Sequence, residues 1–166
     1  MIAHLTLTTD TLRPLLHALD ALNSEAETRR VALLHDSGLV LAEAGEEANL
    51  DHGESGALAA GTFFAARHLA RRLGESAFTG LHYQGAGRDF LLAAAGPEAL
   101  LLIVFDARTR PAIVRACLQK HLPGIEAATA HLHSPPTAPT GAWIPETTAF
   151  HETSRPSADL ASVFHT

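Results

Sequence analysis

The chain has 166 residues, of which 46% are apolar and 18% are charged, a composition typical of one globular domain with a hydrophobic core. Its formal net charge of -6 provides no attraction for nucleic acid or an anionic membrane, and it favours a protein partner. Cys117 is the only cysteine, so an intramolecular disulfide is excluded and the reducing cytoplasm is the expected location.

The first 45 residues predict a helix followed by a hairpin. Leucines recur at helical spacing over residues 12–22, after Thr9 or Asp10 as the cap and with Pro14 in the first turn. Two apolar runs, residues 31–35 and 39–44, then flank the segment Asp36-Ser37-Gly38. A three-residue connection with glycine where a left-handed conformation is needed predicts that the two runs pair as strands.

Residues 54–73, ended by Gly74, predict the central helix of the fold. At helical periodicity both of its faces are apolar, whereas a surface helix of a monomer needs only one apolar face. The second face therefore meets another layer of the domain or another chain, and its small residues indicate an interface; a buried central helix is the alternative. One face comprises Ala59, Phe63, Ala66, Ala70 and Leu73, and the predicted interface face comprises Ala57, Ala60, Gly61, Phe64 and His68.

Three further strands are predicted over residues 78–83, 88–95 and 99–105, separated by short glycine-containing turns. The last strand is apolar without alternation, which indicates a central strand covered on both faces. A final helix follows, with Thr109 as its cap and Pro111 in its first turn, and Pro123 is expected to stop it.

These elements predict an α+β fold with the order helix-strand-strand-helix-strand-strand-strand-helix and a five-stranded antiparallel sheet between helical layers. We assign the domain to residues 1–122 and a mostly irregular tail to residues 123–166, which hold six of the nine prolines. Two apolar segments of this tail could dock on the domain, Trp143-Ile144-Pro145 and residues 160–164.

No arrangement of residues predicts catalysis, a metal site or a cofactor. His131 and His133 lack a third ligand in a rigid neighbouring element. The segment Gly85-Ala86-Gly87 lies between strands and has no lysine-serine or lysine-threonine pair, so it is interpreted as a hairpin turn and not as a phosphate loop. Cys117 lies on the apolar side of the last helix, where a buried inert thiol is expected.

Three motifs carry a family resemblance. They are Leu73-Gly74-Glu75 with Phe78, His82-Tyr83-Gln84-Gly85, and the segment Val104-Phe105-Asp106-Ala107-Arg108-Thr109 followed by Val114-Arg115. In this order the motifs resemble the roadblock/dynein-light-chain family, and more narrowly its bacterial MglB-type members, which regulate Ras-like GTPases of the MglA type. The resemblance covers roughly residues 5–122.

The resemblance implies a homodimer in which the central helices of two subunits lie side by side and the third strands join into a continuous sheet. It also implies that a small Ras-like GTPase binds across the paired helices, and that its GTP hydrolysis rises without an arginine finger from the regulator, because the partner's own groups are repositioned. The expected dimer and partner interface comprises Ala57, Ala60, Gly61, Phe64, His68, Arg71, Phe78, Leu81 and Tyr83.

The sequence departs from the family pattern at Phe64 and His68, where MglB-like members tend to have alanine or glycine. Either the partner differs and receives these side chains, which we favour, or GTPase binding is lost and the dimer is a scaffold. A small-ligand sensor is a third hypothesis. Arginines that flank the central helix and the last helix are either solvated or anchor a partner, and they are Arg67, Arg71, Arg72, Arg108 and Arg110.

Overall fold

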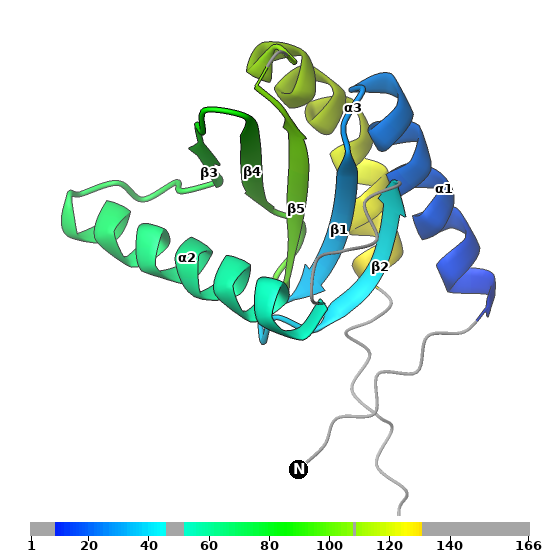
Figure 1. Ribbon diagram of the computed structural model, residues 1–166. Coiled ribbons are helices and arrows are strands. Elements are labelled where there is room, and N and C mark those ends of the chain that lie inside the picture. Colours follow the sequence, from blue (N-terminus) through cyan, green and yellow to red (C-terminus); the bar gives the residue numbers. More distant parts are fainter. Residues whose placement is uncertain (1–8, 46–51, 108, 131–166) are drawn as a thin grey trace, which may run out of the picture. The chain divides into compact units, whose positions relative to one another are not determined.

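The computed structural model describes residues 9–45, 52–107 and 109–130 of the chain (Figure 1). The predicted order of helices and strands is confirmed, and the fold is α+β. The elements are α1 (Thr9–Glu25), β1 (Arg30–His35), β2 (Val40–Gly45), α2 (His52–Arg72), β3 (Gly80–Tyr83), β4 (Arg88–Ala94), β5 (Ala99–Asp106) and α3 (Pro111–Ala130).

The five strands form one antiparallel sheet with the order β2-β1-β5-β4-β3. β5 lies in the centre and pairs with both β1 and β4. All of its residues except Val104 and Asp106 are buried, so the uninterrupted apolar run marks a strand covered on both faces, as predicted. β2 and β3 are the two edge strands.

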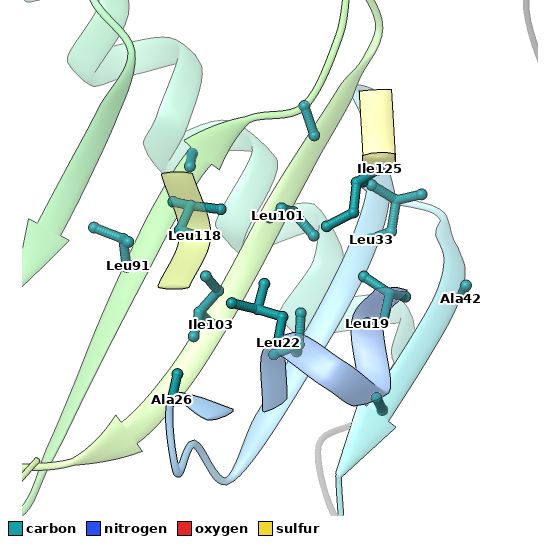
Figure 2. Close-up of a cluster of buried hydrophobic side chains, with 14 of the residues drawn as sticks. Leu19, Leu22, Ala26, Leu33, Ala42, Leu91, Leu101, Ile103, Leu118 and Ile125 are labelled. Atoms are coloured by element: carbon teal, nitrogen blue, oxygen red, sulfur yellow. The ribbon is translucent and has the colours of Figure 1, made fainter. Parts of the chain in front are cut away.

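The larger core lies between the sheet and the helices α1 and α3, which pack against each other on one face (Figure 2). Leu15, Leu19 and Leu22 of α1 are at most 1% exposed, because their spacing places them on one side of the helix. Burying each such side chain contributes roughly 1.5–3 kcal/mol. From the sheet, Leu33, Leu101 and Ile103 complete this core.

Among the helices that the structure describes, only α2 covers the opposite face of the sheet (Figure 1). Ala59, Ala60 and Phe63 of this helix belong to a cluster with apolar side chains from all five strands. The start of the helix touches the β1–β2 turn so closely that a Cβ on Gly56 would lie 2.1 Å from the carbonyl oxygen of Gly38. Only glycine fits at this contact, and Gly38 also has a φ of +90°, which fits its predicted place in the turn.

The expectation that Pro123 ends the last helix is wrong, because α3 continues through it to Ala130. A proline inside a helix removes one backbone hydrogen bond and destabilises the helix by about 3 kcal/mol. Packing beyond the proline offsets this loss: Ile125 is fully buried, and the buried Thr129 hydroxyl donates a hydrogen bond to the carbonyl oxygen of Ala95 at 3.2 Å. The packed domain therefore extends past residue 122, and residues 131–166 of the predicted tail lie outside the described residues.

An exposed ionic cluster joins α1 to α3. The Glu25 carboxylate accepts hydrogen bonds from Lys120 Nζ at 2.8 and 2.9 Å and lies 3.0 Å from His121 Nε2. The hydrogen bond from Lys120 lowers the pKa of Glu25, and the same bond raises the pKa of Lys120. Because the pKa of Glu25 is lower in the folded state than in the unfolded chain, its ionised carboxylate stabilises the fold when the pH is above the unfolded-state pKa. This contribution is lost as the pH falls through the folded-state pKa. Solvent screening keeps the effect small.

Ile125→Ala tests whether the helix beyond Pro123 belongs to the core. We expect the free energy of unfolding to fall by about 2–5 kcal/mol, because the change leaves a cavity under α3. Gly124→Ala is the matched control: its added Cβ meets open space and should stabilise the helix by about 0.5–1 kcal/mol. Urea unfolding measures both variants, and an unchanged midpoint for Ile125→Ala would contradict the packing described here.

Candidate interaction surface

The outer side of α2 carries an exposed and mostly apolar stripe, which we call the leucine stripe: Leu58, Thr62, Ala65 and Leu69. The spacing of four, three and four residues places the side chains on one side of the helix. Leu58 is 63% exposed and Leu69 is 59% exposed, and both intervening residues are exposed as well. Sequence reasoning missed both leucines, although their helical spacing from Thr62 and Ala65 was a signal that could have found them.

The predicted division of α2 into two faces needs two corrections. Ala60, assigned to the interface, is 4% exposed and packs on the sheet beside Phe63. Leu73, assigned to the covered face, is 78% exposed because it lies just beyond the last helical residue. Ala57, Gly61 and His68 are exposed in the single chain, and their place in an interface stays a prediction.

Phe64 is half-buried and lies at the flank of α2. Its ring meets that of Phe63 edge to face with centroids 5.8 Å apart, and the guanidinium of Arg67 lies 4.6 Å from the Phe64 centroid. Part of the bulk that departs from the family pattern therefore packs against the chain's own side chains. The exposed His68 is the freer of the two unusual residues.

β3 has an open edge, since it pairs with β4 on one side and is the last strand of the sheet. The Ala94 N–H donates a hydrogen bond to the Thr79 carbonyl oxygen at 3.0 Å, so the backbone N–H and C=O of Thr79 point toward β4. Backbone groups alternate in direction along an antiparallel strand, and those of Gly80 and His82 therefore point outward from the sheet. Such an edge is a template for pairing with another strand.

Side chains on both faces of the sheet fix the position of β3. On the face of α3, His82 Nε2 lies 2.8 Å from the buried carboxylate of Asp89, and the His82 ring stacks on Phe105. The other oxygen of Asp89 accepts the Gly85 N–H at 3.1 Å, which ties the β3–β4 turn to the same carboxylate. On the face of α2, Leu81 packs in the smaller core.

The end of β3 carries exposed aromatic surface. Tyr83 is 52% exposed, and its ring stacks on that of Phe90 with centroids 4.8 Å apart and planes 10° from parallel. Just before the start of the strand, the ring of Phe78 packs against that of Phe63 of α2, with the ring centroids 5.3 Å apart. This contact places α2 close to the start of β3, at the open edge of the sheet.

Charged residues lie at both ends of α2, with Glu54 in its first turn and Arg71 and Arg72 in its last turn. Of the other arginines considered from the sequence, Arg110 is exposed before α3, and residue 108 lies outside the described residues. The parts of the chain that the structure describes hold no cluster of three potential metal ligands. None of the described helices has the length and apolar character needed to cross a lipid bilayer.

This arrangement defines a class of small α+β domain, in which one described helix packs on one face of a five-stranded antiparallel sheet with an open edge. The family model of the Roadblock/LC7 domain matches residues 15–105, which is more than half of the chain. The protein belongs to the Roadblock/LC7 family, as its motifs indicated. Comparison with curated protein sequences finds no significant match.

Solved structures share the fold. Myxococcus xanthus MglB is 25% identical, with a TM-score of 0.70 over 77% of this chain and 96% of that one. The gliding protein MglB from Thermus thermophilus is 23% identical, with a TM-score of 0.71 over 79% of this chain and 99% of that one. A structure described as MglB with tetrameric arrangement is 22% identical, with a TM-score of 0.73 over 80% and 99% of the two chains.

Gly61→Arg tests whether the flank of α2 pairs with another copy. A Cβ on Gly61 meets no atom within 4 Å, so the folded chain accommodates the substitution, whereas a second helix packed on this flank would be displaced. We expect an unchanged helix content by circular dichroism and loss of self-association in sedimentation. Gly124→Arg, also in open space, is the control; a Gly61→Arg protein of the parent's mass would show that this flank is not the interface.

Proposed function

We propose that this protein is a non-enzymatic homodimeric regulator of a small Ras-like GTPase of the MglA type, acting as a GTPase-activating protein or co-regulator. The observation that carries the proposal is the leucine stripe on the outer side of α2, next to the open edge of β3, in a chain of the Roadblock/LC7 family. Contiguous exposed apolar surface of this kind marks protein interaction sites.

Self-association is supported by the open edge of β3. Antiparallel pairing of two copies of this strand would satisfy the outward backbone groups of Gly80 and His82 and join the two sheets into one. A twofold axis perpendicular to the joined sheet keeps both α2 helices on the same face. Ala57 and Gly61 are small enough to let the two helices approach each other along their flanks.

The two leucine stripes would then lie on one face of the dimer and form a platform for the GTPase. Leu58 and Leu69 supply apolar contact, and Arg72 at the end of α2 supplies positive charge for an acidic surface of the partner. Because the described surface holds no group of residues arranged for phosphoryl transfer, the chemistry stays with the GTPase. The regulator acts by holding the GTPase's own catalytic groups in place.

The alternative function is a dimeric scaffold that leaves GTP hydrolysis unchanged. It is suggested by Phe64 and His68, which are bulkier than the residues typical of MglB-like members. Phe64 is partly covered by Phe63 and Arg67, so it takes less of the partner surface than its size suggests. This observation favours an altered contact over a lost one. His68 remains as an exposed side chain that a partner would have to accommodate.

Leu69→Glu separates partner binding from folding. A carboxylate in an apolar contact loses its hydration, so we expect the affinity for the GTPase to fall at least tenfold, which corresponds to about 1.4 kcal/mol. Dimer mass should not change, because Leu69 points away from the sheet. The assay measures GTP turnover by the small GTPase encoded nearest to this chain, with and without the regulator. Ile113→Glu in the first turn of α3 is the control, since Ile113 is 46% exposed and α3 packs on the opposite face of the sheet from α2.

The same preparation distinguishes the two functions. A regulator raises or lowers turnover in its parent form, and Leu69→Glu loses that effect while Ile113→Glu keeps it. A dimeric scaffold leaves GTP turnover unchanged. A parent protein that neither binds the GTPase nor alters its turnover would overturn the proposal.

A further inference from the structure

The last turn of α2 extends past the edge of its own sheet (Figure 1). The contact of Phe63 with Phe78 shows that the helix crosses near the start of β3. Beyond that crossing the helix no longer packs against its own sheet, and every residue from 71 to 77 is exposed. A helix end that leaves its own core in this way presents its sheet-facing side to any surface that continues the sheet.

Arg67 and Arg71 occupy equivalent positions one helical turn apart, because residues four apart share a side of the helix. On that side of the helix, the Arg67 guanidinium lies 4.6 Å from the centroid of the Phe64 ring and 6.0 Å from that of the Phe63 ring. Arg71 lies about 6 Å farther along the helix. There the chain's own sheet has ended, and Arg71 is exposed.

At the opposite end of β3, the stacked rings of Tyr83 and Phe90 form an aromatic shelf. Side chains alternate along the strand, and Leu81 packs in the α2-side core, so Tyr83 lies on that face too. Phe90 packs in the same core and is only partly buried. The shelf and Arg71 therefore lie on one face of the sheet but near opposite ends of β3.

Resting on the self-association proposed above, we infer that Arg71 of each copy lies over the Tyr83–Phe90 shelf of the second copy. In an antiparallel pair the start of one β3 faces the end of the other. A helix that crosses near the start of its own β3 and continues outward therefore meets the end of the second copy's β3. Adjacent strands are about 4.8 Å apart, so the last turn reaches the second copy's β3 and β4, where the two rings lie.

The contact is a cation–π interaction, in which the Arg71 guanidinium lies over aromatic rings of the second copy. Arg67 makes the same kind of interaction with rings of its own chain. Arginine is suited to it because a planar guanidinium stacks on a ring while keeping its hydrogen-bond donors free. The twofold axis produces the contact twice. It adds an interface component that neither the paired strands nor the helix flanks supply.

A double-mutant cycle on dimer dissociation tests this contact, using Arg71→Ala, Tyr83→Leu and the two together in the full chain. Each single change should raise the dimer dissociation constant by roughly two- to thirtyfold for each of the two contacts. The dissociation constant of the double variant should not exceed the larger of the two single-variant values. Arg72→Ala is the matched control, since Arg72 points about 100° farther around the helix. Melting temperatures measured at concentrations where parent and variants are all monomeric should match, because both positions are exposed.

Cross-linking gives a second measurement. In a Cys117→Ser background, Arg71→Cys with Tyr83→Cys should form a covalent dimer with a short bismaleimide, and Arg72→Cys with Tyr83→Cys should form much less. Additive effects in the cycle together with no preferential cross-link, in a parent that sediments as a dimer, would overturn the contact and leave the proposed function standing. A parent that sediments as a monomer would overturn both.

Discussion

The close packing of a single helix on one face of the sheet is the constraint on which the interaction surface depends. α2 approaches the sheet through Gly56, Ala59 and Ala60, and the contact with Gly38 leaves no space for a side chain. Because two helices cover the other face while this helix stands alone, nothing within the described domain covers its outer side. The exposure of Leu58 and Leu69 is therefore a consequence of the number of layers, and it does not reflect a weak core.

The same packing determines how the open edge is presented. β3 has only four residues, and a short edge strand without support would fray. Phe78 and Leu81 attach it to the core beneath α2, while the carboxylate of Asp89 holds His82 and the following turn from the other face. A strand held on both faces loses little conformational entropy when it pairs, which favours association through this edge.

Much of the fold followed from the sequence, because glycine turns divide the strands and the uninterrupted apolar run of β5 identifies the central strand. The errors concern features that depend on tertiary packing. Helical periodicity could not tell which apolar side of α2 is covered, so Ala60 was assigned outward and the leucine stripe was missed. Pro123 was interpreted from local propensity alone, whereas the burial of Ile125 and the Thr129 hydrogen bond outweigh the proline. The pairing of the interface residues between copies is a property of an assembly, which one chain's sequence carries only through family resemblance.

In the proposed assembly, the size of the surface would make partner binding depend on self-association. A stable protein interface buries about 800 Å² on each partner, and one stripe of four residues, two of them small, is too narrow to supply that area. Two stripes on one face of a dimer approach it, so the binding of a partner would require both copies. Binding would then draw the monomer–dimer equilibrium toward the dimer, because a ligand that binds one state stabilises that state. In such a system the concentration of this protein, as well as its affinity, sets how much of the partner is regulated.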